Sequence, residues 1–323
     1  MMRWRRCSRT LTLPLLLSLA ASLAAAREGA EQPPAPPAAG TTAKAEQEVE
    51  PESGWRTFVR EDLPRLLVAV GVDQAASIYS RSVGPSTDPL IFEDPPRLDE
   101  EVREALQDPN PPKAYVDEHG LETLRYGAPL GLIFLNLGDG RMMARDLLGF
   151  VETFYTNQGL TSLLKEIVGR ERPYFEYADP NDLTPEEYEE MLDDPSSRES
   201  FPSGHASGSF AFASYLERSI AREIGLRGPG RVASFTCLYG LAGYIGYTRI
   251  RNDKHYFTDV VAGAALGTWV GRTYYRLNHR EEYAPPERRG SIRGAPRIRL
   301  NPPQIVPGGV AVTASIRLGA DRP

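Results

Sequence analysis

This chain of 323 residues has little cysteine and, past its N-terminal leader, no long hydrophobic run. Its two cysteines exclude a disulfide framework: Cys7 falls in the leader, and Cys237 lies in an apolar segment where we expect it to be buried. The apolar stretches 232–247 and 260–270 are shorter than the roughly 20 residues that a transmembrane helix needs. We therefore expect both to be central helices of a soluble bundle, with a membrane bundle as the alternative.

The N-terminus has the three parts of a secretory signal peptide. A basic region is followed by the apolar run 11–23 and by three small residues, 24–26. Cleavage near Ala26 would make the protein periplasmic or secreted, whereas a retained anchor is the alternative. The formal charge is −6, and loss of four arginines with residues 1–26 would make it −10. Such an acidic chain is a poor partner for nucleic acid.

Composition divides the rest of the chain into three parts. Residues 27–52 are rich in Ala, Pro and Glu and predict a disordered tether. Residues 53–280 show helical periodicity and predict an all-α domain. Residues 281–323 form an Arg- and Pro-rich tail in which 297–300 and 310–318 alternate as strands do, so we expect a short C-terminal β-hairpin.

The stretch Phe201–Ser209 reads as a helix start that could hold an anion. Ser203 is a good N-cap residue, and apolar residues follow it at helical spacing, opposite a polar face that makes the helix amphipathic. The first turn of a helix offers unpaired N–H groups and a positive dipole end. Gly204 would let a ligand approach the backbone, and His205 would lie beside it. Taken alone, the same pattern also fits an ordinary helix cap.

Two further stretches carry matching chemistry. Lys165 and Arg172 are seven residues apart, which on a helix puts both on one face, and Pro173 then ends the helix. Two such cations can bind one phosphate, although a solvated basic face is the alternative. Downstream, we expect His255 and Asp259 to be neighbours on one helical face. Asp259 would then orient His255 as a nucleophile, with Arg249 nearby; a surface hydrogen bond is the alternative.

Together these three blocks resemble the signature of the type 2 phosphatidic acid phosphatase (PAP2) family, shared with class A acid phosphatases and vanadium haloperoxidases. The similarity covers residues 165 to about 271, and Thr248 stands where many members have Ser. The resemblance implies a helical bundle with the site between helices and no metal cofactor. The phosphate-binding residues that it implies are Lys165, Arg172, Ser203, Gly204 and Arg249. It further implies that His255 attacks phosphorus, that His205 protonates the leaving group and later activates water, and that Asp259 orients His255.

The leading expectation is an exported, metal-independent phosphatase acting on phosphate monoesters or diphosphates, lipid or soluble. Vanadate would inhibit it. A vanadium-dependent haloperoxidase, with vanadate as cofactor, and a catalytically idle envelope binding protein are the alternatives. Peripheral contact with a membrane and the oligomeric state stay open. Between the first two blocks, residues 176–199 hold ten acidic side chains against one arginine. We expect a short exposed helix there near the mouth of the site, either simply solvated or acting as a negative lid.

Overall fold

The computed structural model describes residues 58–86, 91, 94–108, 115–178 and 183–280, together with four short strands between 297 and 317. The predicted signal peptide and tether lie outside these residues. Helical elements are η2 (Phe58–Asp62), α3 (Leu63–Ser82), α4 (Arg97–Leu106), α5 (Tyr115–Leu135), α6 (Gly140–Val168), α7 (Pro173–Glu176), α8 (Pro185–Asp193), η3 (Pro195–Arg198), α9 (Gly204–Glu223), α10 (Gly228–Arg251) and α11 (Phe257–Asn278). The expected all-α helical bundle is therefore confirmed, and the short exposed helix expected between the first two blocks is α8, which begins with a capping box at Thr184.

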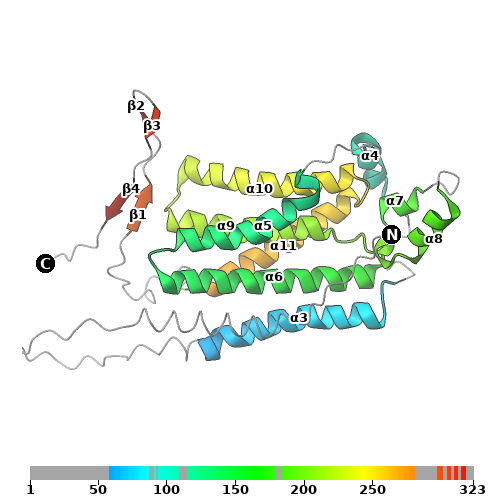
Figure 1. Ribbon diagram of the computed structural model, residues 1–323, viewed down its shortest axis with the longest axis horizontal. Helices are drawn as coiled ribbons and strands as arrows, with labels where there is room; N and C mark the ends of the chain where they lie inside the picture. The colour runs from blue at the N-terminus through cyan, green and yellow to red at the C-terminus, as the bar shows by residue number, and fades with distance from the viewer. Residues whose placement is uncertain are drawn as a thin grey trace, which may run out of the picture.

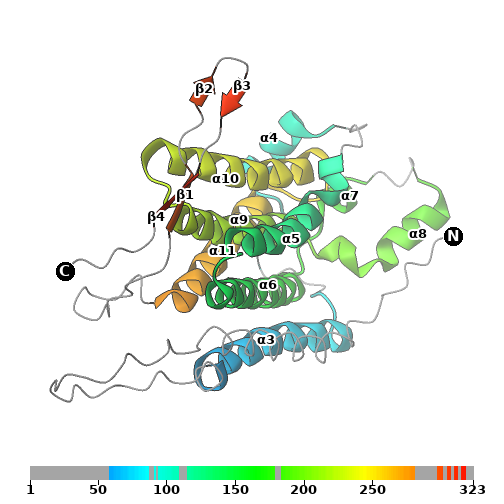
Figure 2. The ribbon, with the colours of Figure 1, turned by 60° about the vertical axis from the view of Figure 1, so that its left-hand side comes forward.

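Helix α9 lies at the centre of the bundle. Figures 1 and 2 show it surrounded by α5, α6, α10 and α11, and all four helices contact it. Phe212 and Tyr215 of α9 pack with Phe150 of α6, Ile245 of α10 and Tyr275 of α11 in the main hydrophobic core. Helix α3 packs on the outer side of α6 through a second, smaller cluster.

Glycines allow α9 and α11 to pack unusually close together. A Cβ at Gly263 would lie 2.5 Å from the carbonyl oxygen of Ser203, and one at Gly267 would overlap the carbonyl oxygen of Ser207. At Gly271 a Cβ would overlap the hydroxyl of Ser214. We call this close contact at Gly263, Gly267 and Gly271 the glycine seam. It joins the N-terminal ends of both helices, which carry the second and third sequence blocks.

Two expectations about exposure prove wrong. Helix α10 is peripheral rather than central: most of its first half faces outward, with Val232 and Phe235 exposed. Cys237 lies on that half and is exposed, not buried. Apolar composition alone did not distinguish an inner helix from an outer one.

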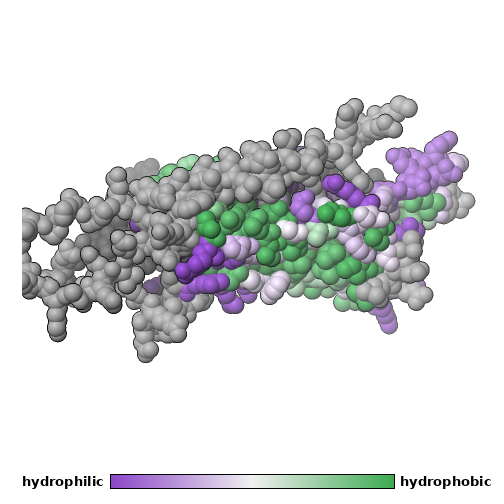
Figure 3. Space-filling view, turned by 90° about the horizontal axis from the view of Figure 1, so that it is seen from below, coloured by the Kyte–Doolittle hydropathy of each residue, from purple (hydrophilic) through white to green (hydrophobic). Residues whose placement is uncertain are grey.

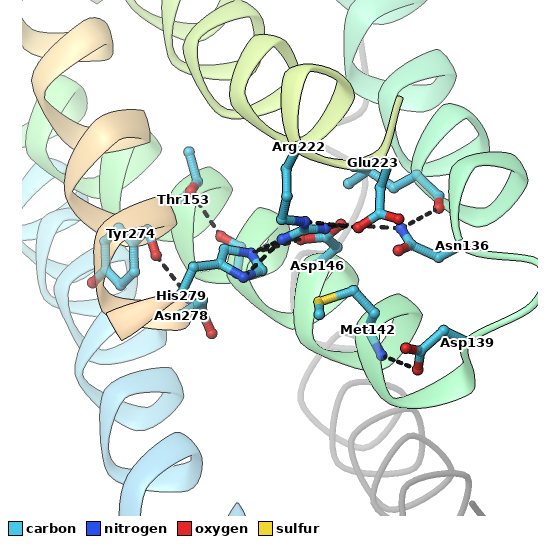
Figure 4. A network of polar contacts seen from close by, with 12 residues as sticks. Asn136, Asp139, Met142, Asp146, Thr153, Arg222, Glu223, Tyr274, Asn278 and His279 are labelled. Carbon is cyan, nitrogen blue, oxygen red and sulfur yellow. Dashed lines mark hydrogen bonds and ion pairs between the residues drawn. The ribbon is translucent and has the colours of Figure 1, made fainter. Parts of the chain in front are cut away.

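A buried polar network holds the end of the bundle opposite the three sequence blocks (Figure 4). Asp146 near the start of α6 accepts hydrogen bonds from Arg222 at 2.7 Å and His279 at 2.8 Å. Asn136 donates to the same carboxylate at 3.0 Å. The pKa of Asp146 is lowered even though burial opposes this, because hydrogen bonding to His279 and the charge of Arg222 favour the ionised form. The network ties the C-terminal ends of α9 and α11 to α6.

Apolar side chains also reach the surface. Seen from below, the described surface on the α3 side is broadly apolar, with hydrophilic residues toward its ends (Figure 3). Exposed side chains here include Leu67, Val68 and Ile78 of α3 and Val83 just after it. Among the described helices, none combines the length and the apolar composition needed to cross a bilayer.

The tail contains two antiparallel strand pairs. Strand β1 (Arg297–Leu300) pairs with β4 (Ala314–Arg317), with Arg297 opposite Arg317. Strand β2 (Gln304–Val306) pairs with β3 (Gly309–Ala311), with Val306 opposite Gly309.

Candidate active site

The first sequence block is split between the end of α6 and the loop that follows. Helix α6 ends at Val168, and Gly169 closes it with a φ of 63°, a left-handed conformation that favours glycine. Arg172 thus lies outside the helix, so the expectation that Lys165 and Arg172 share one helical face is wrong. Lys165 remains in the last turn, where its ammonium group is directed at the start of α9. A Cβ at Gly204 would lie 4.0 Å from Lys165 Nζ.

The second block begins α9 as predicted. Ser203 is the N-cap residue, and its hydroxyl accepts a long hydrogen bond of 3.5 Å from the N–H of Ala206. Its own N–H donates to the carbonyl oxygen of Asp259 at 3.0 Å, which joins this block to α11. Added atoms at Gly204 would meet only ordinary van der Waals contacts. Packing therefore does not demand glycine there, and the open backbone is available to a ligand.

The third block spans the end of α10, a loop and the start of α11. Arg249 lies buried in the last turn of α10, His255 lies in the loop, and Asp259 is the third residue of α11. The expected pair on one helical face is therefore wrong, because His255 precedes the helix. His255 Nδ1 donates to the carbonyl oxygen of Ser200 at 2.8 Å, whereas Asp259 Oδ2 lies 3.7 Å away. This bond leaves Nε2 as the unprotonated ring nitrogen of neutral His255.

Charged groups of the first and third blocks shift the pKa values of residues in other blocks. Burial, together with the positive charges of Arg249 and Lys165 and the influence of His255, lowers the pKa of His205 to about 3. Burial likewise lowers the pKa of His255 to about 4, against the stabilising effect of Asp259 and with help from Arg172 and Lys165. Both imidazoles are therefore neutral near pH 7 in a site without a bound anion.

Lys165 and Arg172 interact electrostatically. Burial lowers the pKa of Lys165 to about 8, and the positive charge of Arg172 adds to this effect. Glu199, whose carboxylate lies 3.9 Å from Lys165 Nζ, works in the opposite direction. Arg172 also has a buried Nε–H with no hydrogen-bond partner in the described structure. A buried charged donor without an acceptor is costly, so an anion beside these two cations would satisfy it.

Sequence reasoning missed three residues behind His255. Ser200 supplies the carbonyl for His255, and its hydroxyl donates to Asp259 Oδ2 at 2.6 Å. Arg170 donates to Asp259 Oδ1 at 2.6 Å and to Asp99 at 2.8 Å. Arg170 and Ser200 could have been suspected, because they lie within a few residues of the predicted blocks. Nothing in the sequence marks Asp99, which precedes the first block by more than sixty residues.

Other features of the described structure lie elsewhere. Among the described residues, no group of three or more His, Cys, Asp or Glu side chains is arranged to hold a metal ion. An open groove of about 560 Å³ is lined by residues of α9 and α11, including Phe210, Trp269 and Arg272, and by none of the predicted site residues. His119 is exposed on α5, and His279 belongs to the buried network of Asp146.

Comparison with known proteins agrees with this arrangement. Residues 146–283 match the PAP2 superfamily. A lipid A 1-phosphatase of Porphyromonas gingivalis is 38% identical over 80 residues, which is 24% of this chain and 16% of that protein. Diacylglycerol pyrophosphate phosphatase 1 of Saccharomyces cerevisiae is 28% identical over 149 residues, 40% of this chain and 50% of that protein. The chain thus spans half or less of these curated relatives.

A solved structure is also similar. A transmembrane PAP2 type phosphatidylglycerolphosphate phosphatase from Bacillus subtilis is 18% identical, with a TM-score of 0.41, covering 71% of this chain and 99% of that one. The matched region, 146–283, contains all three sequence blocks and the helices that position them. Residues 146–283 of this chain thus match the PAP2 superfamily.

Proposed function

We propose that this protein is a phosphohydrolase that cleaves phosphate monoesters or diphosphates through a phosphohistidine at His255, without a metal ion. The proposal is supported by Lys165, which lies beside the first turn of α9, and by the charges of Arg172 and Arg249, which lower the pKa values of His255 and His205. Buried cations and helix N–H groups stabilise the charge of a phosphoryl group in transfer.

In the first step, Nε2 of His255 attacks phosphorus and the bond from phosphorus to the leaving oxygen breaks. The low pKa of His255 keeps this nitrogen unprotonated near pH 7. The leaving oxygen takes a proton from His205. The negative charge of a bound phosphate offsets the cations that lower the pKa of His205. This imidazole therefore becomes protonated when the substrate binds.

In the second step, His205 accepts a proton from water as the water attacks the phosphorus of the phosphohistidine. The phosphorus–nitrogen bond breaks, inorganic phosphate leaves and neutral His255 is restored. Asp259 stabilises positive charge on His255 during the attack, and the Ser200 carbonyl holds its ring.

The substrate belongs to the same proposal. The relatives named above act, by their names, on lipid A and on diacylglycerol pyrophosphate. A lipid phosphate or diphosphate is therefore our first candidate, and a soluble phosphate ester is the second. Exposed apolar side chains on α3 and α10 support peripheral contact with a lipid surface.

A phosphate-release panel tests the proposal on the full chain. It compares diacylglycerol pyrophosphate, phosphatidic acid, lipid A and p-nitrophenyl phosphate, each with EDTA and with vanadate. We expect release from at least one substrate, full activity in EDTA and inhibition by vanadate. Loss of activity in EDTA that a divalent ion restores would contradict metal independence. Halide oxidation with peroxide and vanadate, without phosphate release, would favour the haloperoxidase instead.

Export is a separate part of the proposal. The basic and apolar pattern of residues 1–26 supports it. N-terminal sequencing of the protein recovered from the envelope or medium should begin just after Ala26. A chain that retains residues 1–26 would contradict cleavage.

A further inference from the structure

Helix α4 lies before the region that matches the family, yet it contacts the core of the site. Its Asp99 is wholly buried. Asp99 Oδ1 accepts the backbone N–H of Thr258 at 2.8 Å, and Oδ2 accepts from Arg170 Nη2 at 2.8 Å. Since an unpaired buried carboxylate is costly, these bonds fix α4 against the start of α11.

Arg170 carries this contact on to Asp259. Its Nη1 donates to Asp259 Oδ1 at 2.6 Å, and its guanidinium lies 4.0 Å above the ring of Tyr256. One planar cation thus lies between two buried carboxylates. Because Asp99 fixes the plane of the guanidinium, it also fixes the carboxylate of Asp259, which lies beside His255.

A second contact from α4 reaches the loop that carries His255. The guanidinium of Arg103 binds the carboxylate of Asp253 in a bidentate way: Nε donates to Oδ1 at 2.6 Å and Nη2 donates to Oδ2 at 2.8 Å. Asp253 has a φ of 55°, the left-handed region that non-glycine residues avoid unless surrounding contacts hold them there. The N–H of Asp108, just past α4, donates to the carbonyl oxygen of Arg251 at 3.0 Å. The loop is therefore held from α4 at Asp253, and the end of α10 just before the loop is held at Arg251.

We propose that Asp99 and Arg103 are positioning residues, which hold His255 in its reactive orientation through Arg170 and Asp259 and through Asp253. The inference rests on the proposed hydrolysis at His255 and adds to it a helix outside the family match.

Asp99→Asn is the sharpest variant. The amide can still accept from Thr258, but its NH₂ group would face the guanidinium of Arg170, so two donors meet where a salt bridge stood. The guanidinium then turns, and Asp259 turns with it. Because a small misplacement near the reacting atoms costs about 100-fold in rate, we expect kcat to fall about tenfold to 100-fold. KM should stay within about threefold, because the phosphate-binding cations are untouched.

Glu101→Gln is the matched control on the same helix. Among the described residues, Glu101 pairs with exposed Arg97 at 2.8 Å, and such surface pairs contribute little. Arg103→Lys is a milder companion variant: it keeps the charge but loses the two-pronged bond to Asp253. We expect Arg103→Lys to lower kcat by a smaller factor than Asp99→Asn and Glu101→Gln to leave it unchanged.

A readout independent of activity separates positioning from general damage. The chain has only four histidines, so ¹⁵N-histidine NMR of the full chain can follow each ring. In Asp99→Asn and in Arg103→Lys, the ring signals of His255 should shift while those of His279, at the far end of the bundle, stay in place. If wild-type protein hydrolyses no substrate, the proposed function fails, but these NMR shifts still test the positioning.

Two results would overturn the inference. One is a folded Asp99→Asn protein with wild-type kcat and unchanged His255 signals. The other is equal shifts of His255 and His279, which would mean general loosening of the bundle. Should Asp99→Asn fail to fold, Arg103→Lys decides alone: unchanged His255 signals in that variant would refute the inference.

Discussion

The imidazole of His255 is oriented by the backbone of Ser200, with Nδ1 2.8 Å from the carbonyl oxygen, and not by a direct hydrogen bond to Asp259. Asp259 instead accepts from the Ser200 hydroxyl, from Arg170 and from the N–H of Tyr256 at 2.9 Å. The carboxylate therefore acts mainly as a fixed negative charge, whereas a main-chain group sets the tautomer. No side-chain substitution can remove that carbonyl.

Asp259→Asn should accordingly retain the tautomer of His255. We expect kcat to fall about 100-fold, less than the ~10⁴-fold loss seen when the wrong tautomer results from such a change. Arg170 then loses one of the two carboxylates that are seen to bind it in the described structure, so we also expect a lower melting temperature. Ser200→Ala removes one hydroxyl and keeps the carbonyl, so its kcat should fall less than tenfold. Steady-state kinetics with thermal unfolding measure both variants, and a larger loss in Ser200→Ala than in Asp259→Asn would contradict this account.

The nucleophile can be identified by trapping the intermediate. A reaction with ³²P-labelled substrate is quenched, and the stability of the label on the protein is then compared in acid and in base. Phosphoserine survives acid, whereas phosphohistidine is lost in acid and survives base. We expect no labelled protein from His255→Ala. His205→Ala should still form labelled protein, slowly, because His255 Nε2 remains available while the proton donor is lost. Label that persists in His255→Ala would mean that another residue attacks phosphorus.

Lys165 should limit activity on the alkaline side. It binds phosphate only when protonated, and its pKa is lowered to about 8, so kcat/KM should fall as the pH rises through about 8. Glu199 raises this pKa, and Glu199→Gln should therefore shift the alkaline limb to lower pH. Glu186→Gln, on exposed α8, is the control for general loss of acidic charge. Equal shifts in both variants would favour a long-range effect of the acidic segment instead.

The glycine seam should be sensitive to a single methyl group. In Gly267→Ala the new Cβ overlaps the carbonyl oxygen of Ser207, so α9 and α11 must move apart. We expect a loss of about 3 kcal/mol in the free energy of unfolding, together with reduced activity, because the same seam positions Ser203 and Asp259. Denaturant unfolding monitored by circular dichroism measures the change.

Gly240→Ala is the control for that substitution. Gly240 is exposed in α10 with nothing within 4 Å of a new Cβ, so alanine should stabilise the helix by about 0.5–1 kcal/mol. If Gly267→Ala is as stable as Gly240→Ala, close packing of α9 on α11 is not what the glycines provide.

Local chemistry in the sequence was enough to predict the helices and the N-cap at Ser203, because periodicity and capping depend on neighbours along the chain. The same local rules failed for Arg172 and His255, since a helix was assumed to continue where Gly169 and the loop before α11 interrupt it. They also misjudged exposure at Cys237, because burial depends on what packs against a helix.

Only the tertiary structure brought Asp99 to Arg170, and Ser200 to His255. These contacts join residues 71 and 55 positions apart, and no local pattern encodes them. The sequence determined which chemical groups are present and where helices begin. The packing of α4, α9 and α11 decided which buried polar groups pair with one another. Buried charges and donors need hydrogen-bond partners, and the fold determines which partners lie within reach.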